Sequence, residues 1–375
     1  MHSHVPDWWD EAVAAIRANY DRQFDGLPIH CSTSGGRTSA VMALFLREAF
    51  EDDPGRVYYS FRNTGREHRE TLKFLDRLDR LYHIPIVWLE YVPPPKGAAP
   101  KHFSHRVVTY ETADRGGKPL VSMLQALADF RATKGLDAIG MTPRMRLCTA
   151  KVKIAVGWQW MTGQVGPEFV DAVGLRADEP GRVSGLVAHR KGAEPWCPLA
   201  VAGIDKNMVL EFWAGREGDL ALDEPWGNCD GCYLKDEADL ADIFYTEPLV
   251  GEWWSIVEAH FGTPCPVRRP WASFSNHTEA EEWGRGRRLT LVGPAEHNGA
   301  TVWLFHTAPT FNGTGATYSQ IIEELSERMR IRAALAAGET PIGNRRLIRQ
   351  ESRLHRNKFS CSCEAAGALA ESWEE

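Results

Sequence analysis

Two hydrophobic periods alternate along the first half of the chain. Short, nearly continuous apolar runs predict buried strands at residues 27–34, 57–61, 84–91 and 169–176. Between several of them, apolar residues recur at the helical spacing and predict amphipathic helices at residues 39–50, 66–82 and 119–135. Strand and helix patterns that take turns in this way are typical of βαβ units. We therefore expect an α/β fold with a mostly parallel sheet flanked by helices.

The same pattern indicates how the rest of the chain is organised. Further helices are predicted at residues 8–25, 205–215 and 249–262, and a polar, irregular segment at 101–118. The pattern of hydrophobic and polar residues changes near residue 263. After this point we expect a hairpin at 286–306, a charged helix at 317–337 and a polar tail at 338–375. This predicts an N-terminal helical lead-in over residues 1–26, an α/β domain over residues 27–262 and a smaller C-terminal extension over residues 263–375.

Composition narrows the class of protein. The chain has 375 residues, 43% of them hydrophobic, with 43 Lys and Arg against 50 Asp and Glu for a formal net charge of −7. Such a chain can bury a substantial core. It holds no apolar stretch of the roughly 18 residues that a membrane span needs, and its start does not resemble a signal peptide, so a cytoplasmic location is expected. The net charge argues against broad nucleic-acid binding but allows a local basic patch, for which residues 345–358 are the candidate.

A glycine-containing loop follows the first predicted strand and opens the next helix. Its sequence, SGGRTS, offers glycines for close approach to an anion, hydroxyl donors and one cation: Ser34, Gly35, Gly36, Arg37, Thr38 and Ser39. The free N–H groups and dipole of a helix N-terminus favour a phosphate at such a position. The spacing matches neither a Walker A loop nor a GxGxxG dinucleotide loop. From the residues alone, the loop is either an anion cradle or an ordinary capped turn.

Two other turns are expected at the same edge of the sheet, because each follows a predicted strand. One contains Asn63, Thr64 and Gly65 and leads to Glu67, whose charge could serve a ligand or simply complement a helix dipole. The other, GLRADEPGR, carries two arginines and two carboxylates: Arg176, Asp178, Glu179 and Arg182. Guanidinium groups bind sulfate and phosphate in bidentate fashion, although a salt-bridged surface turn would use the same residues.

The eight cysteines are too sparse for a disulfide scaffold and form two clusters. Cys229 and Cys232 form a CxxC pair, which suits zinc, an iron–sulfur cluster or a redox pair. Cys148 lies beside several basic residues, a setting that stabilises a thiolate. Cys361 and Cys363 lie in the polar tail, where they are either a second functional pair or part of an unstructured end. We expect Cys31 and Cys265 to be buried core residues.

The SGGRTS loop resembles the SGGxDS pyrophosphate-binding loop of the PP-loop ATP pyrophosphatase and phosphoadenosine phosphosulfate reductase superfamily. Further segments resemble the same superfamily in the same order: FRNTGREHRETLKFL, RLCTAKVKI, GLRADEPGR and GNCDGCYLK. The most similar group is that of phosphoadenosine phosphosulfate reductase family proteins, common in phage-like genomes. The resemblance implies a Rossmann-like adenine nucleotide alpha hydrolase fold. Thr38 stands where the superfamily loop has Asp, which weakens the expectation of a bound Mg²⁺.

The resemblance also implies roles for particular residues. The loop from Ser34 to Ser39 would hold the phosphates of ATP or a sulfonucleotide, and Asn63–Gly65 would line the adenosine side. Lys153 corresponds to a family lysine that pairs with phosphate or with an anionic cluster. A [4Fe–4S] cluster is implied, with zinc as the alternative. Its implied ligands are Cys148, Cys229 and Cys232, with Cys197 as the available fourth.

Three functions follow from these expectations. The preferred hypothesis is an ATP pyrophosphatase-like iron–sulfur enzyme that adenylylates a substrate for sulfur transfer or for modification of a nucleobase or nucleic acid. Here Arg176, Arg182 and Lys153 would act on the reacting phosphates. The first alternative is a sulfonucleotide reductase that releases sulfite, with Cys363 or Cys361 as nucleophile and a thioredoxin-like reductant as partner. The second is a non-catalytic, nucleotide-sensing interaction protein.

Overall fold

The computed structural model describes most of the chain as two compact units. The described residues are 5–136, 140–142, 146–186, 193–222, 226–227, 229–262, 266–285, 289–297, 300–307 and 316–359. Unit 1 comprises Met1–Gly135 and Cys148–Asp230, and unit 2 comprises Leu136–Leu147 and Gly231–Glu375. The domain boundary expected between residues 262 and 263 stays a prediction. None of the described helices combines the length and the apolar character that a bilayer crossing demands.

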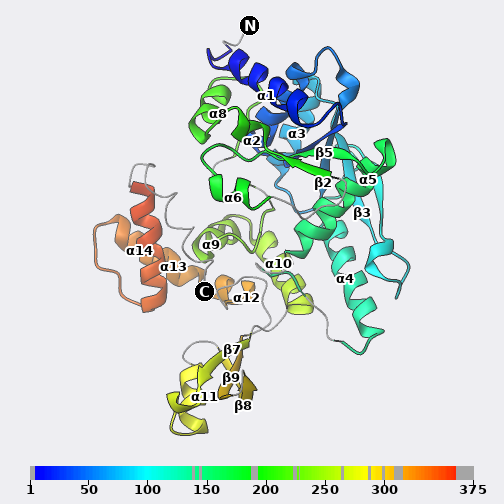
Figure 1. The fold of residues 1–375 in the computed structure, drawn as a ribbon. Helices are drawn as coiled ribbons and strands as arrows, with labels where there is room; N and C mark the ends of the chain where they lie inside the picture. Colours follow the sequence, from blue (N-terminus) through cyan, green and yellow to red (C-terminus); the bar gives the residue numbers. More distant parts are fainter. Residues whose placement is uncertain are drawn as a thin grey trace. The chain divides into compact units, whose positions relative to one another are not determined.

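Unit 1 is built on a six-stranded sheet in the order β4-β3-β2-β1-β5-β6. Strands β2, β3 and β5 of this sheet are labelled in Figure 1. Only β4 is antiparallel to its neighbour, and the other pairs are parallel. This confirms the α/β fold with a mostly parallel sheet. The strands are β1 (Ile29–Thr33), β2 (Val57–Asn63), β3 (Val87–Val92), β4 (Ser104–Val108), β5 (Phe169–Ala172) and β6 (Ala193–Trp196).

Helices cover both faces of this sheet. Successive side chains of β1 point to opposite faces, and so identify which helices cover each one. Ile29 and Cys31 are fully buried in the apolar core that also contains the inner face of α2. His30, between them, points to the opposite face, where its ring meets Trp160 of α5. On the first face lie α1 (Trp9–Gln23), α2 (Arg37–Ala49), α3 (Arg69–Tyr82) and α8 (Lys206–Trp213). On the second lie α4 (Lys118–Ala132) and α5 (Ala155–Val165).

Two strands differ from the sequence-based expectations. β4 lies within residues 101–118, for which we expected no regular structure. It is an edge strand whose side chains are all exposed or half-exposed, so it has no apolar run to mark it. β6 is an edge strand of four residues that includes Pro195, which gives it no strand signal either. Short helical turns complete the unit: η1 (Pro54–Arg56), η2 (Pro100–His102), the π-helical η3 (Cys148–Ile154), α6 (Pro180–Ser184) and α7 (Pro198–Val201).

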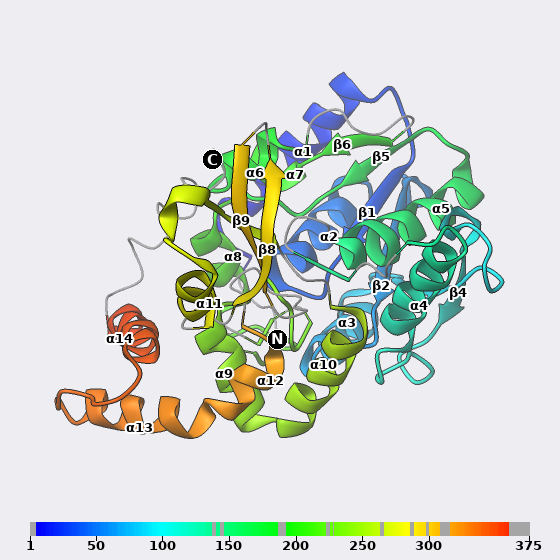
Figure 2. The ribbon, with the colours of Figure 1, turned by 90° about the horizontal axis from the view of Figure 1, so that it is seen from below.

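Unit 2 combines helices with a small antiparallel sheet of order β7-β9-β8. The expected hairpin is confirmed, and Figure 2 shows its strands β8 and β9 side by side. The expected helix at residues 317–337 is divided at Glu324, and the predicted polar tail contains a further helix, α14. The elements are α9 (Glu237–Thr246), α10 (Pro248–Phe261), β7 (Pro266–Pro270), η4 (Trp271–Ser273), α11 (His277–Arg285), β8 (Leu289–His297), β9 (Ala300–Thr307), α12 (Tyr318–Glu323), α13 (Leu325–Ala336) and α14 (Arg345–Phe359).

Candidate functional site

The glycine loop joins the carboxyl end of β1 to the first turn of α2. Gly35 has φ +78°, and a Cβ atom there would lie 2.4 Å from Thr71 Cγ2, so only glycine fits. Ser34 is tied across the loop, since its amide donates to Ser39 Oγ over 3.1 Å. Gly36 is the N-cap of α2, and no side chain in the described structure caps the helix there. The described start of α2 thus lacks a side-chain cap, an arrangement that leaves room for an anion, and anion binding by the loop stays a prediction.

The GLRADEPGR segment after β5 lies directly against this loop. A Cβ atom on Gly174 would lie 3.3 Å from the Cα atom of Ser39, so the absence of a side chain allows the close approach. Arg176 then donates a hydrogen bond to Thr38 Oγ1 over 3.4 Å. Its guanidinium also forms a bidentate pair with Asp178, at 2.8 and 3.0 Å. The fold thus unites two motifs that lie far apart in the sequence.

Arg176 and Arg182 have different environments, although both were predicted to bind an oxyanion. The side chain of Arg176 is 17% exposed, whereas that of Arg182 is 70% exposed and pairs with Glu179. The same Glu179 carboxylate lies 3.4 Å from Arg176. The hydrogen bond from Arg176 also lowers the pKa of Asp178. Arg182 therefore sits in the kind of surface salt bridge that the sequence left as its alternative, and only Arg176 faces the loop.

A pocket of about 390 Å³ opens beside the N-terminus of α2. Its polar lining consists of Arg37, Thr38, Arg176 and Lys206. Its remaining lining is apolar or small and consists of Val209, Leu210, Leu220, Leu222 and Gly227. The volume falls in the roughly 300–1,000 Å³ range of small-molecule sites. A lining that combines cations with leucines suits a ligand with an anionic part and an apolar part.

The sequence did not identify Lys206 or the apolar wall. Lys206 is the first residue of α8, whose N-cap is Asp205, and nothing local in the sequence marks it as a neighbour of α2. The only signal was the Asp–Lys start of a helix, which is common in any protein. Arg37 pairs with Asp219 at 2.7 and 3.0 Å, and its predicted contact with a phosphate stays a prediction. It also donates to the carbonyls of Leu220 and Leu222, and so holds the pocket wall.

A second group of predicted residues assembles around the turn after β2. Glu67, almost fully buried, accepts hydrogen bonds from the amide and the hydroxyl of Thr64 at 2.9 and 2.8 Å. Lys153 Nζ lies 3.6 Å from Glu67 and 3.9 Å from the Cys229 thiol. Cys229 also contacts the Thr64 hydroxyl at 3.5 Å. Three separate motifs of the sequence thus meet here, and Gly227, two residues before Cys229, lines the pocket described above.

Asn63 and Gly65 form the turn rather than facing open space. The Asn63 amide donates to the Glu90 carboxylate over 2.7 Å and to the Asp114 carbonyl over 2.8 Å. Gly65 has φ +80°, and a Cβ atom there would lie 2.4 Å from the Asp114 side chain. These contacts fix the loop from residue 114 to 117 against β2. The predicted adenosine contact by Asn63, Thr64 and Gly65 stays a prediction, and their described contacts are within the protein.

The described residues do not form the metal site that the cysteines suggested. No group of three or more His, Cys, Asp or Glu side chains within the described ranges is placed to hold a metal ion. Cys148 opens η3 and Cys229 follows later in unit 1, while Cys232 belongs to unit 2. The described neighbours of Cys229 include an ammonium group, which cannot ligate a metal. The iron–sulfur or zinc assignment to Cys148, Cys229 and Cys232 therefore stays a prediction from the sequence.

The other cysteines have distinct environments. Cys197 is the N-cap of α7 and is 9% exposed, and burial raises its pKa to about 11. The predicted role of Cys197 as a fourth ligand stays a prediction. Cys31 is fully buried in the core, as expected. Cys265, Cys361 and Cys363 lie outside the described residues.

Comparisons with known proteins agree with this geometry. Residues 28–134 match the phosphoadenosine phosphosulfate reductase domain. The chain is also 27% identical over 247 residues to the "Uncharacterized nin region protein ORF290" of Escherichia phage lambda, covering 63% of this chain and 78% of that protein. The domain match includes the glycine loop and the turn after β2 but ends before Lys153, Arg176 and Cys229. Residues 28–134 thus resemble a phosphoadenosine phosphosulfate reductase domain, and the six-stranded, mostly parallel sheet is consistent with the adenine nucleotide alpha hydrolase fold.

Proposed function

We propose that this protein is a PP-loop-like enzyme that binds an adenine nucleotide in the pocket beside α2. One observation carries the proposal. The open N-terminus of α2, Arg176 and Lys206 surround a single pocket at the carboxyl end of β1. In open α/β sheets this edge is where ligands bind. The domain match over residues 28–134 supports a nucleotide as the ligand class.

Each part of the pocket has a role in this proposal. The N–H groups at the start of α2 and the Arg176 guanidinium bind phosphate oxygens, and Lys206 adds a point charge. The leucine side chains of the lining cover the base and ribose. Arg37 is a positioning residue, because it anchors the segment that carries Leu220 and Leu222. Gly35 keeps the loop in the conformation that opens the helix end.

The proposed reaction is adenylylation of an acceptor. An oxygen of the acceptor attacks the α-phosphorus of ATP, the bond between the α- and β-phosphates breaks, and pyrophosphate leaves. The cations of the pocket would stabilise the charge that develops on the departing pyrophosphate. The acceptor would then undergo sulfur transfer, or would be a nucleobase or nucleic acid undergoing modification.

The test is to measure which product the full-length chain releases. Incubated with ATP and candidate acceptors, it should release pyrophosphate and AMP. Incubated with a sulfonucleotide and a reduced thioredoxin, it should release no sulfite. Sulfite release without pyrophosphate release would overturn the proposal. Stoichiometric ATP binding without turnover of any acceptor would instead favour the nucleotide-sensing alternative.

A sulfonucleotide reductase is the second candidate, favoured by the domain match itself. Arg176 suits a sulfate as well as a phosphate, because both present a fork of oxygens. This reaction would use the thiol of Cys361 or Cys363 as nucleophile on the sulfur. The Cys361→Ser and Cys363→Ser variants separate the two candidates. If the chain is a reductase, one of these substitutions should abolish sulfite release; if it is the ATP-using enzyme, both should leave pyrophosphate release unchanged.

The [4Fe–4S] cluster is a further proposal that rests on the sequence positions of Cys148, Cys229 and Cys232. Anaerobic purification with iron, sulfide and zinc analysis tests it directly. Near four irons and four sulfides per chain, lost in a Cys229→Ser variant, would support the cluster. A colourless, zinc-loaded or metal-free protein would contradict it.

A further inference from the structure

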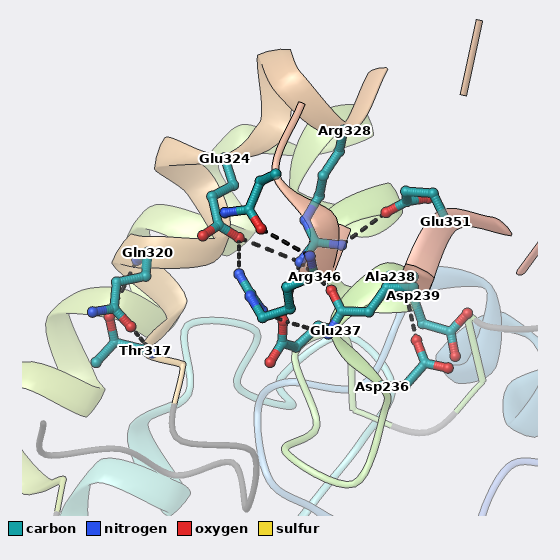
Figure 3. Close-up of polar contacts among 12 residues, drawn as sticks. Asp236, Glu237, Ala238, Asp239, Thr317, Gln320, Glu324, Arg328, Arg346 and Glu351 are labelled. Carbon is teal, nitrogen blue, oxygen red and sulfur yellow. Dashed lines mark hydrogen bonds and ion pairs between the residues drawn. The ribbon is translucent and has the colours of Figure 1, made fainter. Parts of the chain in front are cut away.

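The basic helix near the C-terminus has two unlike faces. On the inner face of α14, Glu351 is 1% exposed and Leu347 is fully buried. The Glu351 carboxylate accepts a hydrogen bond from Arg328 of α13 over 2.8 Å, and Arg332 reaches its second oxygen. Arg346 pairs with Glu237 and Glu324 (Figure 3). The inner cations of this cluster are therefore neutralised by carboxylates.

The outer face carries arginines alone. In the part of α14 whose side chains are described, residues 345–353, the exposed residues are Arg345, Arg349 and Arg353. None of these three makes a hydrogen bond or ion pair with any described residue. They recur every four residues, so they form one stripe along the helix, about 12 Å long from first to last. We refer to these three residues as the α14 stripe.

Nothing acidic within α14 offsets the stripe. The sequence of the helix, RRLIRQESRLHRNKF, contains a single acid, Glu351, and that residue is turned inward. Opposite charges on a solvated helix usually alternate, which gives pairs three or four residues apart. Here the only carboxylate neutralises the interior, and the outward charge is left entirely positive. The buried cluster also holds α14 in a fixed place on unit 2, so the stripe is presented by an ordered element (Figure 3).

We infer that the α14 stripe docks the phosphodiester backbone of a nucleic acid. Three guanidinium groups spread over about 12 Å cannot be met by one small anion, but they match a chain of phosphates. A protein partner would be expected to find an apolar anchor at the centre of the surface, and the exposed residues of this face are all arginine. Contacts of this kind position a nucleic acid without reading its sequence.

The inference concerns unit 2 and is independent of the nucleotide pocket in unit 1. It also explains how a chain with a net charge of −7 could hold a polyanion, since the positive charge is local. Duplex DNA, single-stranded DNA and RNA share the backbone chemistry. The three are therefore compared in the same experiment, which shows which of them the stripe prefers.

The test uses the full-length chain with all three arginines changed, Arg345→Gln, Arg349→Gln and Arg353→Gln. Binding of labelled 20-nucleotide duplex DNA, single-stranded DNA and RNA is measured by anisotropy as NaCl is varied. Three lost phosphate contacts should weaken binding at least tenfold at low salt and reduce the slope of log K against log salt by about 2 to 3. An ATP titration of the same variant should be unchanged.

A matched control removes the same charge elsewhere. Arg22, Lys101 and Lys134 are exposed in unit 1, and their triple Gln variant should bind nucleic acid within about twofold of the parent. Equal losses in the two variants, an unchanged salt slope, or a parent chain that binds none of the three nucleic acids would overturn the inference. So would equally tight, stripe-dependent binding to anionic lipid vesicles.

Discussion

Arginines and carboxylates gather at two places in this protein, and the two clusters have opposite characters. Around Arg328 in unit 2, the guanidinium is fully buried and bonded to Glu237 and Glu351 (Figure 3). Beside α2 in unit 1, Arg176 and Lys206 line an open pocket next to an uncapped helix end. Both clusters contain arginines and carboxylates, so residue type alone does not distinguish them. The difference is that the cluster around Arg328 is fully buried, whereas Arg176 and Lys206 border a cavity.

The two clusters should also contribute to different free energies, one to folding and the other to ligand binding. Burying charges costs free energy that only complete pairing repays, so a closed cluster makes the fold depend on every member. Charges that border a cavity keep part of their hydration, and a ligand that enters the cavity can contact them. Substitution in the first cluster should therefore damage stability, and substitution in the second should damage binding.

The largest effect is expected from Arg328→Met. The substitution leaves Glu237 and Glu351 buried without their central cation, which should lower the free energy of unfolding by about 3–5 kcal/mol. Urea denaturation followed by circular dichroism measures it. Arg349→Gln, on the exposed side of α14, should change the same quantity by less than about 0.5 kcal/mol. A loss below 1 kcal/mol for Arg328→Met would mean that the buried cluster does not hold unit 2 together.

The next largest effect is expected from Gly35→Ala. Its methyl group would collide with Thr71 at a backbone angle that strains any side chain, at a cost of about 1–3 kcal/mol. We expect nucleotide affinity to fall roughly tenfold or more, measured by titration calorimetry. Gly36→Ala is the matched control, because its φ is −100° and its nearest neighbour would be Ser34 Oγ at 3.7 Å. Equal affinity losses in both variants would show that the loop geometry is not what opens the helix end.

Arg176→Gln and Lys206→Gln test the pocket charges. Each loss of a charged hydrogen bond to phosphate is worth about 1.5–3 kcal/mol, so nucleotide binding should weaken roughly ten- to hundredfold in each variant. Stability should change little, in contrast to Arg328→Met. Arg182→Gln should bind within about twofold of the parent, since that side chain is 70% exposed and outside the pocket lining. If Arg182→Gln weakened binding as much as Arg176→Gln, our distinction between the two arginines would be wrong.

The smallest effect concerns pH. The hydrogen bond from Arg176 lowers the pKa of Asp178 in the folded chain, so the pair stabilises the fold above the ordinary aspartate pKa of about 3.9. That stability is lost as pH falls through the lowered pKa. The side chain of Asp178 is 39% exposed, and solvent screening keeps the contribution below about 1 kcal/mol. Asp178→Asn should therefore be slightly less stable than the parent near pH 7 and equally stable near pH 2. A difference that persists in acid would contradict this assignment.

The sequence predicted best what depends on neighbouring residues. The loop around Gly35 could be recognised because strand, glycines and helix follow one another, and the sheet followed from the same alternation. Edge strands were missed, since β4 exposes most of its side chains and lacks an apolar run. The hairpin at β8 and β9 was found because both strands lie close together in the chain.

Contacts between distant segments could not be derived in the same way. Lys206 borders the pocket only because α8 packs beside α2, which no local pattern encodes. Arg37 and Asn63 bond to Asp219 and Glu90, partners distant in the sequence that no local pattern indicates. The inward turn of Glu351 depends likewise on Arg328 of another helix. Residue type and spacing indicated which chemistry was available, and the fold decided which groups were still open to a ligand.

The most direct test of the central claim is a calorimetric titration of the full-length protein with ATP in the presence and absence of inorganic pyrophosphate. If the pocket beside α2 holds the phosphates of a nucleotide, one ATP should bind per chain, pyrophosphate should compete with it, and an Arg176→Gln/Lys206→Gln double variant should show no measurable binding. An absence of ATP binding, or binding that neither pyrophosphate nor the double substitution weakens, would contradict the claim.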